Sequence, residues 1–360
     1  MTEHVRVVGT GLLGTSIGIA LSRKGIRVSL HDISPTAVAL ARDLGAGVVD
    51  DDTAPDLVVV AAPPDVAGQV VADELERWPD AFVTDVASVK ATVLDDVTAR
   101  APAHVGRYVG SHPMAGRERS GAVAAQADLF EGRTWVICPH DRSAREAHDL
   151  VRRMALAAGA VPTVMGAREH DAAVATVSHL PQVAASLVAA RLREVPEDAV
   201  ALAGQGVRDV TRIAASDPLL WTQILAANAE ALLPVVDHLV ADLDAVRSAL
   251  QQVAHDRATE GARGVLAQAI AHGQLGRARI PGKHGAPPTT YATLIAVIPD
   301  EPGSLARLFA DVGDAGVSIE DVRIEHARGG PVGLAELYVV PAAIEPLREA
   351  LVAAGWNVHD

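Results

Sequence analysis

The hydrophobic positions in the first part of the chain form short runs separated by segments with helical spacing. The runs cover residues 5–8, 26–30, 57–61, 82–85, 108–110 and 134–138. Short continuous apolar runs are typical of strands buried on both faces, and strands that alternate with helices form parallel sheets. The pattern therefore predicts an α/β domain over residues 1–166 with a doubly wound parallel sheet.

The middle of the chain shows no strand pattern. Segments rich in Ala, Leu and Val with helical spacing run from residue 168 to residue 271, with breaks near Pro196, Asp217 and Pro234, within a second domain assigned to residues 167–281. This pattern predicts an all-helical second domain. Residues 282–290 are rich in Gly and Pro and hold few apolar side chains, so they are predicted to be a linker.

The last part of the chain, residues 291–360, returns to a mixed pattern. Strand-like alternation at residues 291–298, 318–326 and 334–340 is combined with helical spacing at residues 304–315 and 344–353. The resulting order, βαββα, predicts a small α+β domain with its helices on one face of a single sheet.

A glycine pattern follows the first predicted strand and opens the first predicted helix. Glycines at positions 9, 11 and 14 form a G-x-G-x-x-G motif, and Asp32 ends the second strand. This context is typical of a Rossmann-type dinucleotide site rather than of a merely tight turn, because backbone N–H groups hold the pyrophosphate and the carboxylate accepts the ribose hydroxyls. A carboxylate would repel a 2′-phosphate, which favours NAD over NADP. The residues assigned to the cofactor are Gly9, Gly11, Leu12, Leu13, Gly14 and Asp32.

A histidine lies downstream of this opening, in the segment 110–116, GSHPMAG. Pro113 restricts the preceding His112 to extended geometry, and Gly116 permits a tight turn, so the imidazole is expected where a strand ends. Ligands bind at that end of open α/β sheets. We therefore favour His112, among fourteen histidines, as a general base.

Two polar residues follow the predicted strand 82–85. The Ser88 hydroxyl and the Lys90 ammonium could line the nicotinamide or substrate side of a site at this sheet edge. The alternatives are that Ser88 caps the next helix and that Lys90 is solvated surface.

The helical middle part carries two further polar clusters. Residues 178–182, SHLPQ, lie on a helical pattern, and Arg208 and Arg212 have i, i+4 spacing. Two guanidinium groups on one helix face suit a dicarboxylate. The alternative is a solvated face paired with Asp209 and Asp217.

Charge and composition narrow the function class. The formal net charge of −14 argues against a nucleic-acid or anionic-membrane surface, and 49% hydrophobic residues can form a sizeable core. A single cysteine, Cys138, excludes an intramolecular disulfide framework, and no Cys/His cluster has zinc spacing, so no metal is expected. No signal sequence or segment apolar enough to span a bilayer is recognised, which favours the cytoplasm.

Taken together, these motifs resemble the prephenate/arogenate dehydrogenase family over roughly the first 280 residues. The matching segments are 9–14, 85–90, 110–121, 178–181 and 208–221. Residues 291–360 resemble an ACT regulatory domain, with residues 300–305, DEPGSL, as its first strand-to-helix loop. The resemblance implies a homodimer that binds NAD.

The resemblance also assigns roles to individual residues. His112 would accept the proton of the ring C4 hydroxyl as hydride leaves for the nicotinamide, with Ser88 orienting it and Arg212 binding the ring carboxylate. The remaining residues implied at the substrate pocket are Arg208, Glu118, Ser178, His179, Gln182 and Trp221.

The resemblance implies prephenate as the substrate, converted to 4-hydroxyphenylpyruvate by oxidative decarboxylation. Gln182 stands where a second histidine is expected in many prephenate-using members, so arogenate, converted directly to tyrosine, is the alternative. A non-catalytic amino-acid sensor is a third reading. Tyrosine is a candidate effector at the ACT-like loop, through Asp300, Pro302 and Gly303, and the alternative is a structural or dimerising domain.

Overall fold

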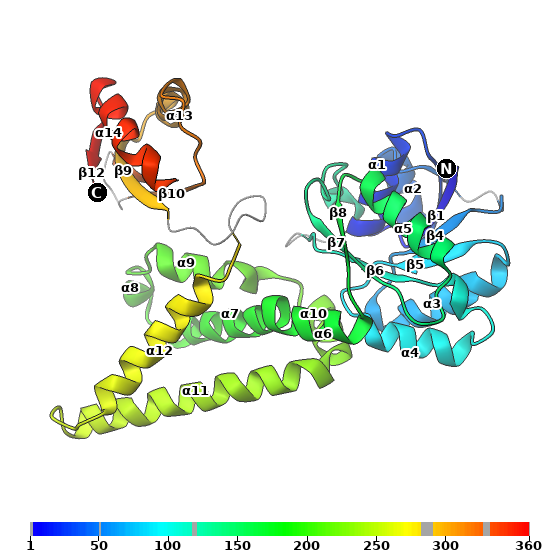
Figure 1. The fold of residues 1–360 in the computed structure, drawn as a ribbon, viewed down its shortest axis with the longest axis horizontal. Helices are drawn as coiled ribbons and strands as arrows, with labels where there is room; N and C mark the ends of the chain where they lie inside the picture. Colours follow the sequence, from blue (N-terminus) through cyan, green and yellow to red (C-terminus); the bar gives the residue numbers. More distant parts are fainter. Residues whose placement is uncertain (1–2, 50–51, 117–120, 282–290, 327–331, 360) are drawn as a thin grey trace. The chain divides into compact units, whose positions relative to one another are not determined.

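The structure is a computed structural model that describes residues 3–49, 52–116, 121–281, 291–326 and 332–359. These residues form two compact units, Met1–Leu239 and Val240–Asp360, and each unit is described by itself below (Figure 1). The predicted linker, residues 282–290, lies outside the described residues, as does the proposed pocket residue Glu118.

The first unit is built on a five-stranded parallel sheet with the strand order β3-β2-β1-β4-β5. Every residue of β1 and β4 is buried, because helices cover both faces, and this explains their continuous apolar runs. The predicted doubly wound sheet is thus confirmed. Its strands are β1 (His4–Val8), β2 (Arg27–His31), β3 (Val48–Val49), β4 (Leu57–Val60) and β5 (Phe82–Asp85).

Helices pack on the two faces of this sheet through separate apolar cores. One core joins the sheet to α1 (Leu12–Ser22), α2 (Pro35–Asp43) and α5 (Arg145–Ala157). The other joins it to α3 (Pro64–Arg77) and α4 (Ala91–Arg100). The connections after β1 and β4 lead to opposite faces, so the strand ends diverge there and leave the crevice where such sheets bind ligands.

A second, three-stranded sheet carries the histidine segment. It consists of β6 (Gly110–Pro113), β7 (Thr134–Cys138) and β8 (Val161–Val164), with β6 antiparallel to β7 and β7 parallel to β8. The strand predicted at residues 108–110 is therefore displaced, because Tyr108 follows a 3₁₀ turn, η1 (Val105–Arg107), and makes only an isolated bridge to Val83. β8 was not predicted, since it is mostly exposed and contains a proline.

The predicted helical domain is confirmed, and two of the three expected breaks fall where helices begin. Pro196 precedes α8, and the Asp217 carboxylate caps α10 by accepting from the Leu219 N–H at 2.8 Å. The break expected near Pro234 is wrong, because this proline lies inside α11. The elements are α6 (Ala167–Val174), η3 (Ala175–His179, a π turn), α7 (Leu180–Arg191), η4 (Leu192–Glu194), α8 (Glu197–Val200), α9 (Gln205–Thr211), η5 (Arg212–Ala215), α10 (Pro218–Ala227) and α11 (Ala229–His255).

One helical stretch, Ala167–Glu194, is long and apolar enough to cross a bilayer by length and composition, and the bent pair of α10 and α11 would be a second. The expectation that no segment passes this test is therefore wrong. The stretch also holds four buried polar side chains, His170, Asp171, His179 and Gln182. The buried core helix of a soluble protein passes the same test.

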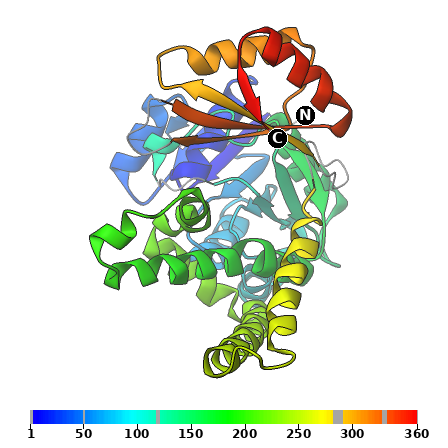
Figure 2. The ribbon, with the colours of Figure 1, turned by 90° about the vertical axis from the view of Figure 1, so that its left-hand side faces the viewer.

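The second unit contains the end of α11, α12 (Ala262–Arg277) and the C-terminal sheet, ordered β10-β11-β9-β12. Alternate strand residues such as Leu294 and Leu337 form a core with α13 and α14, and Figure 2 shows both helices on the same side of the sheet. The predicted βαββα order is confirmed and extended by β12, which pairs with β9. The bounds are β9 (Ala292–Pro299), α13 (Ser304–Asp314), β10 (Asp321–His326), β11 (Val332–Val339), η7 (Pro341–Ala343), α14 (Ile344–Ala353) and β12 (Asn357–His359).

Candidate active site

The turn between β1 and α1 has the geometry of a nucleotide-binding loop. Gly9 has a φ of +98°, and a Cβ there would lie 2.5 Å from the Ala61 carbonyl oxygen. A Cβ on Gly14 would lie 1.9 Å from the carbonyl oxygen of Gly9, whereas a Cβ on Gly11 would meet no atom within 4 Å. No side chain caps α1, so its first N–H groups and the open space beside Gly11 suit an anion such as a pyrophosphate.

Asp32 lies next to this loop, directly after β2. Its carboxylate accepts hydrogen bonds from the Thr10 N–H at 2.7 Å, the Thr10 hydroxyl at 2.9 Å and the Ser34 N–H at 2.8 Å. These bonds fix the carboxylate beside the glycine turn and leave lone pairs on its oxygens for further donors. The two leucines assigned to the cofactor, Leu12 and Leu13, are the first residues of α1.

His112 is the third of the four residues of β6, and its ring is only half-buried. Its Nδ1 lies 2.9 Å from Nε2 of His170 on α6, and the two rings meet edge to face with centroids 5.1 Å apart. Burial, followed by the charges of His170, Lys90 and His179, holds the pKa of His112 well below its usual range. The imidazole is therefore neutral at working pH, as a general base requires.

Lys90 is not solvated surface, because it is 1% exposed. Its ammonium donates to the carboxylate of Asp85 and, at 2.8 Å, to the Ser111 carbonyl oxygen. The Tyr108 hydroxyl donates to the same carboxylate at 2.6 Å, and burial, together with Asp85, raises the pKa of Tyr108 well above its ordinary value. This network fixes the end of β5 beside the strand that carries His112.

Ser88 lies half-buried between β5 and α4. It does not cap α4, because Lys90 occupies the N-cap position and the Asp171 carboxylate accepts from the N–H groups of Lys90 and Ala91, each at 2.8 Å. Among the residues that the structure describes, no hydrogen bond joins Ser88 to His112, whose ring bonds to His170 instead.

His179 lies in a buried polar cluster formed by three helical segments. Its Nδ1 accepts from the Asn228 amide at 3.0 Å, and the same amide donates to the Asp171 carbonyl oxygen at 2.9 Å. The Trp221 ring meets the imidazole edge to face at 6.0 Å. Burial lowers the pKa of His179 to about 4, although Asp171 opposes this shift. The structure thus brings the predicted pair His179 and Trp221 together.

Gln182 is buried one turn further along α7. Its amide nitrogen donates to the Ser186 hydroxyl at 3.3 Å, and its amide oxygen accepts from the Ser216 hydroxyl at 3.5 Å. Ser178 lies half-buried in the π turn that precedes this helix. Both predicted residues therefore belong to the same stretch of helix as His179.

Arg208 and Arg212 do not share one helix, which corrects the expected i, i+4 pair. α9 ends at Thr211, and Arg212 begins the 3₁₀ turn η5. The cause is local, because the Thr211 hydroxyl donates to the Val207 carbonyl oxygen at 2.7 Å and bends the helix end. Both arginine side chains are exposed, and both elements pack against α7.

Three buried polar residues at this site, His170, Asp171 and Asn228, were not predicted from the sequence. In a regular α-helix, nine residues make two and a half turns, so His170 and His179 would lie on opposite faces. The π turn at residues 175–179 inserts extra backbone between them and changes this relation. The only available signal was the adjacent His–Asp pair in an otherwise apolar helical pattern.

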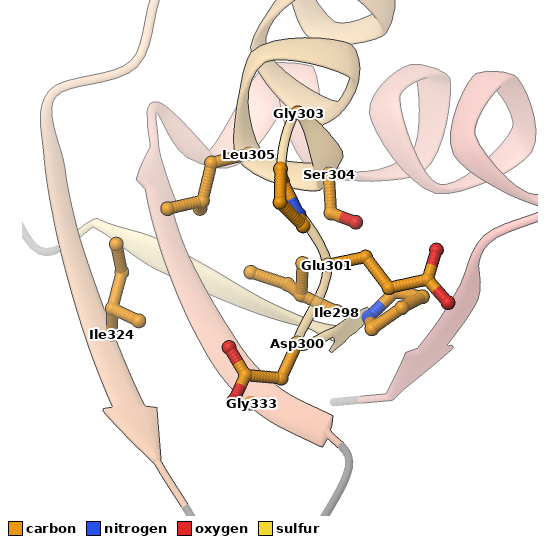
Figure 3. A pocket seen from close by; sticks show the side chains of 10 residues that line it. Ile298, Asp300, Glu301, Gly303, Ser304, Leu305, Ile324 and Gly333 are labelled. Atoms are coloured by element: carbon orange, nitrogen blue, oxygen red, sulfur yellow. The ribbon is translucent and has the colours of Figure 1, made fainter.

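The C-terminal domain holds a separate pocket of about 260 Å³ at the loop between β9 and α13. Asp300, Pro302 and Gly303, predicted to contact an effector, all line it. Figure 3 shows Leu305 and Ile324 on one side of the pocket and the carboxylate of Glu301 on the other. The loop thus combines an apolar wall with two carboxylates.

The comparisons with known proteins agree with this geometry. Residues 17–164 match the nucleotide-binding domain of prephenate dehydrogenase, and residues 166–263 match its dimerization domain. The chain is 36% identical over 357 residues to a probable prephenate dehydrogenase, NovF, of Streptomyces niveus, with 98% of each chain covered. It is 30% identical over 347 residues to the prephenate dehydrogenase of Bacillus subtilis, covering 91% of this chain and 90% of that one.

A solved structure shows the same architecture. The prephenate dehydrogenase of A. aeolicus, in complex with hydroxyphenyl propionate and NAD+, is similar with a TM-score of 0.67 and 28% identity. The match covers 77% of this chain and 98% of that one. The two matched domains and the relatives that span nearly the whole chain show that this protein belongs to the prephenate dehydrogenase family.

Proposed function

We propose that this protein is an NAD-dependent prephenate dehydrogenase that converts prephenate to 4-hydroxyphenylpyruvate with release of CO2. The observation that carries the proposal is His112, a neutral imidazole with a lowered pKa in the unit that also holds the glycine loop. The family relatives named above support the same reaction.

The first unit fits NAD. The glycine turn leaves room beside Gly11, the uncapped start of α1 offers N–H groups, and Asp32 offers a carboxylate for the ribose. When bound, NAD accepts the hydride that leaves the substrate ring. Asp32 disfavours a 2′-phosphate, which supports NAD over NADP.

The chain supplies a base and a cationic anchor for the substrate. His112 takes the proton of the C4 hydroxyl, and its low pKa keeps the ring ready to do so. Arg212 holds the ring carboxylate through charge-assisted hydrogen bonds, and Arg208 adds positive charge on the neighbouring helix. Loss of that carboxylate as CO2 makes the ring aromatic, so the step does not reverse.

The remaining pocket residues select the substrate side chain. Gln182 is a buried neutral amide whose hydrogen bonds to Ser186 and Ser216 hold it in place. A neutral amide gives no ionic partner to the ammonium of arogenate, which favours prephenate. Ser88, Ser178, His179, Trp221 and Glu118 complete the proposed pocket.

The assembly and its regulation are part of the same proposal. Residues 166–263 match a dimerization domain, and α7 to α12 expose many large apolar side chains such as Leu187 and Ile270, so the working unit is a homodimer. The C-terminal domain is an ACT-like module, and the pocket lined by Asp300 and Gly303 binds tyrosine as a feedback inhibitor. The reduced, buried Cys138 suits a cytoplasmic protein.

The test is the initial rate of NADH formation with purified protein, NAD and either prephenate or arogenate at equal concentration. Faster turnover of prephenate is the expected result, and faster turnover of arogenate would make Gln182 a determinant of the opposite preference. If no NADH formed with either substrate, the proposed activity would be refuted and a role as an amino-acid sensor would be favoured. Adding tyrosine at millimolar concentration tests regulation, because an unchanged rate would remove the effector.

A further inference from the structure

Two polar side chains, His170 and Asp171, form a continuous line of hydrogen bonds behind His112. Nδ1 of His112 lies 2.9 Å from Nε2 of His170, and Nδ1 of His170 lies 2.8 Å from the Asp171 carboxylate. That carboxylate also accepts from the backbone N–H groups of Lys90 and Ala91, each at 2.8 Å. His170 and Asp171 are 0% and 4% exposed, so the line is shielded from water.

The Asp171 carboxylate is ionised, and this fixes the proton on His170. Burial alone would raise its pKa, but the hydrogen bonds from His170, Ala91 and Lys90 together lower the pKa below its ordinary value. An ionised carboxylate only accepts hydrogen bonds, so Nδ1 of His170 carries the hydrogen that points at it. In a neutral imidazole the other nitrogen is then an acceptor, so Nε2 of His170 has a lone pair directed at His112.

The lone pair on Nε2 of His170 in turn fixes the tautomer of His112. Its Nδ1 faces an acceptor, so it carries a hydrogen, and the neutral ring has its free lone pair on Nε2. The opposite arrangement, with the hydrogen of a neutral His170 on Nε2, would set the lone pair of its Nδ1 against an Asp171 carboxylate oxygen 2.8 Å away in a buried place, which is costly. It would also place the hydrogen of His112 on Nε2, where the base must be.

We infer that Asp171 and His170 are positioning residues that hold His112 as its Nδ1–H tautomer, so that Nε2 is the atom that takes the substrate proton. This inference rests on the proposed function and deepens it. In the step, the substrate O–H bond breaks, its electron pair becomes part of the new carbonyl group, the hydride goes to NAD, and the proton binds Nε2. The Nδ1 hydrogen stays on His112 and continues to face His170.

The groups around His112 also determine how stable its protonated form is. A protonated His112 faces three positive or titratable groups that oppose its charge: His170 on α6, Lys90 on the segment before α4, and His179 in the π turn. The Asp171 carboxylate lies 2.8 Å from Nδ1 of His170 and supplies negative charge behind that ring. His170 thus acts on the orientation of His112 without touching the substrate.

The chain offers a matched control. α5 carries a second adjacent His–Asp pair, His148 and Asp149, with 3.5 Å between Nδ1 and the carboxylate. This pair lies at the surface, and its histidine side chain is 26% exposed. The substitution His148→Phe therefore removes the same groups as His170→Phe from the same kind of pair, away from His112.

The first experiment reads the tautomer directly and needs no turnover. Nitrogen-15 spectra of histidine-labelled protein, with the His112 signals assigned by their loss in His112→Asn, are expected to show hydrogen on Nδ1. In His170→Phe the His112 signals shift toward a mixture of tautomers, and in His148→Phe they do not. A wild-type ring with hydrogen on Nε2, or a tautomer that is unaffected by His170→Phe, would overturn the inference.

The second experiment separates positioning from simple damage. His170→Phe is expected to lower kcat by about 10- to 100-fold with little change in KM or in NAD affinity. The control, His148→Phe, is expected to leave kcat, KM and NAD affinity unchanged. His170→Gln, whose amide oxygen can accept from Nδ1 of His112, restores part of kcat. Equal losses for Phe and Gln would contradict positioning. A wild-type protein inactive with both substrates would instead contradict the proposed function, and the tautomer measurement would still stand.

Discussion

The chain contains two strand-to-helix turns that rely on glycine, and they are built in opposite ways. The turn before α1 is held by close tertiary contacts, since a Cβ at Gly14 would lie 1.9 Å from the Gly9 carbonyl oxygen. The turn before α13 depends on backbone conformation alone, because Gly303 has a φ of +92° and a Cβ there would meet nothing within 4 Å. A packed turn fixes the position of a ligand, whereas an open one tolerates change.

The surroundings of the two turns differ in the same sense. The first belongs to the unit that also holds a buried polar network at the end of β5 and the start of α4, formed by Lys90, Asp85 and Asp171. The second presents exposed carboxylates, Asp300 and Glu301, to solvent. A preorganised, water-poor site suits catalysis, and an exposed acidic rim suits reversible binding of a ligand with an ammonium group.

The largest expected difference between the two regions comes from His112→Asn. If His112 is the general base, as proposed, its loss should lower turnover of prephenate by roughly two to four orders of magnitude, because an Asn side chain cannot take up the hydroxyl proton. NAD affinity, measured by calorimetry, and tyrosine binding at the C-terminal pocket should be nearly unchanged. Full turnover in this variant would show that the base has been misassigned.

Gly14→Ala should have the next largest effect. The added methyl group has to displace the Gly9 carbonyl, which distorts the pyrophosphate loop, so NAD affinity should fall by about 100-fold, or roughly 3 kcal/mol. Titration of NAD into the variant measures this directly. Gly264→Ala is the control, since its Cβ would lie in open space, and an equal loss of affinity there would refute the packing argument.

Arg212→Ala should act chiefly on substrate binding. Removing the guanidinium that is proposed to anchor the ring carboxylate should raise KM for prephenate by about 10- to 100-fold, with a smaller change in kcat. Arg208→Ala, on the neighbouring helix, should raise KM less. Steady-state kinetics of both variants decide the point, and the reverse order would move the anchor to Arg208.

The buried network should also make the first unit sensitive to acid. The pKa of His179 is lowered to about 4 in the folded protein, against about 6.5 in an unfolded chain, so the unfolded state binds more protons between these values. Folding stability should therefore fall as the pH drops from about 6.5 toward about 4. Urea unfolding at several pH values measures the slope, and His179→Gln should reduce it. An identical slope in the variant would assign the sensitivity elsewhere.

The smallest effect is expected from Gly303→Ala. The left-handed backbone should cost about 1–2 kcal/mol of stability, with no steric clash. Thermal unfolding should show a modest loss, while kcat and NAD affinity stay unchanged. A large loss of activity would mean that the two turns are not as independent as their structures indicate.

The sequence was sufficient where chemistry is local. The apolar runs predicted the buried strands β1, β4 and β5, and the spacing of Gly9, Gly11 and Gly14 predicted the turn that follows β1. The C-terminal βαββα order could also be predicted, because the pattern switches from strand-like alternation to helical spacing within a few residues.

The sequence was insufficient where a side chain acts at a distance. Asp171 caps a helix about eighty residues earlier in the chain. The Lys90 ammonium can be buried because it donates hydrogen bonds to the Asp85 carboxylate and the Ser111 carbonyl oxygen. Neither contact leaves a periodic signal. The π turn before α7 likewise cannot be inferred from spacing that assumes a regular helix.

Asp171 has a consequence for exchange of parts between relatives. Residues 17–164 and 166–263 match two separate family domains, yet this one carboxylate in the second domain supplies the cap for the helix α4 of the first. In a chimera that joins the nucleotide-binding domain of one relative to the helical domain of another, α4 keeps its cap only under one condition. The carboxylate has to lie within hydrogen-bond distance of the N–H groups at the start of that helix. The two domains are therefore best exchanged together.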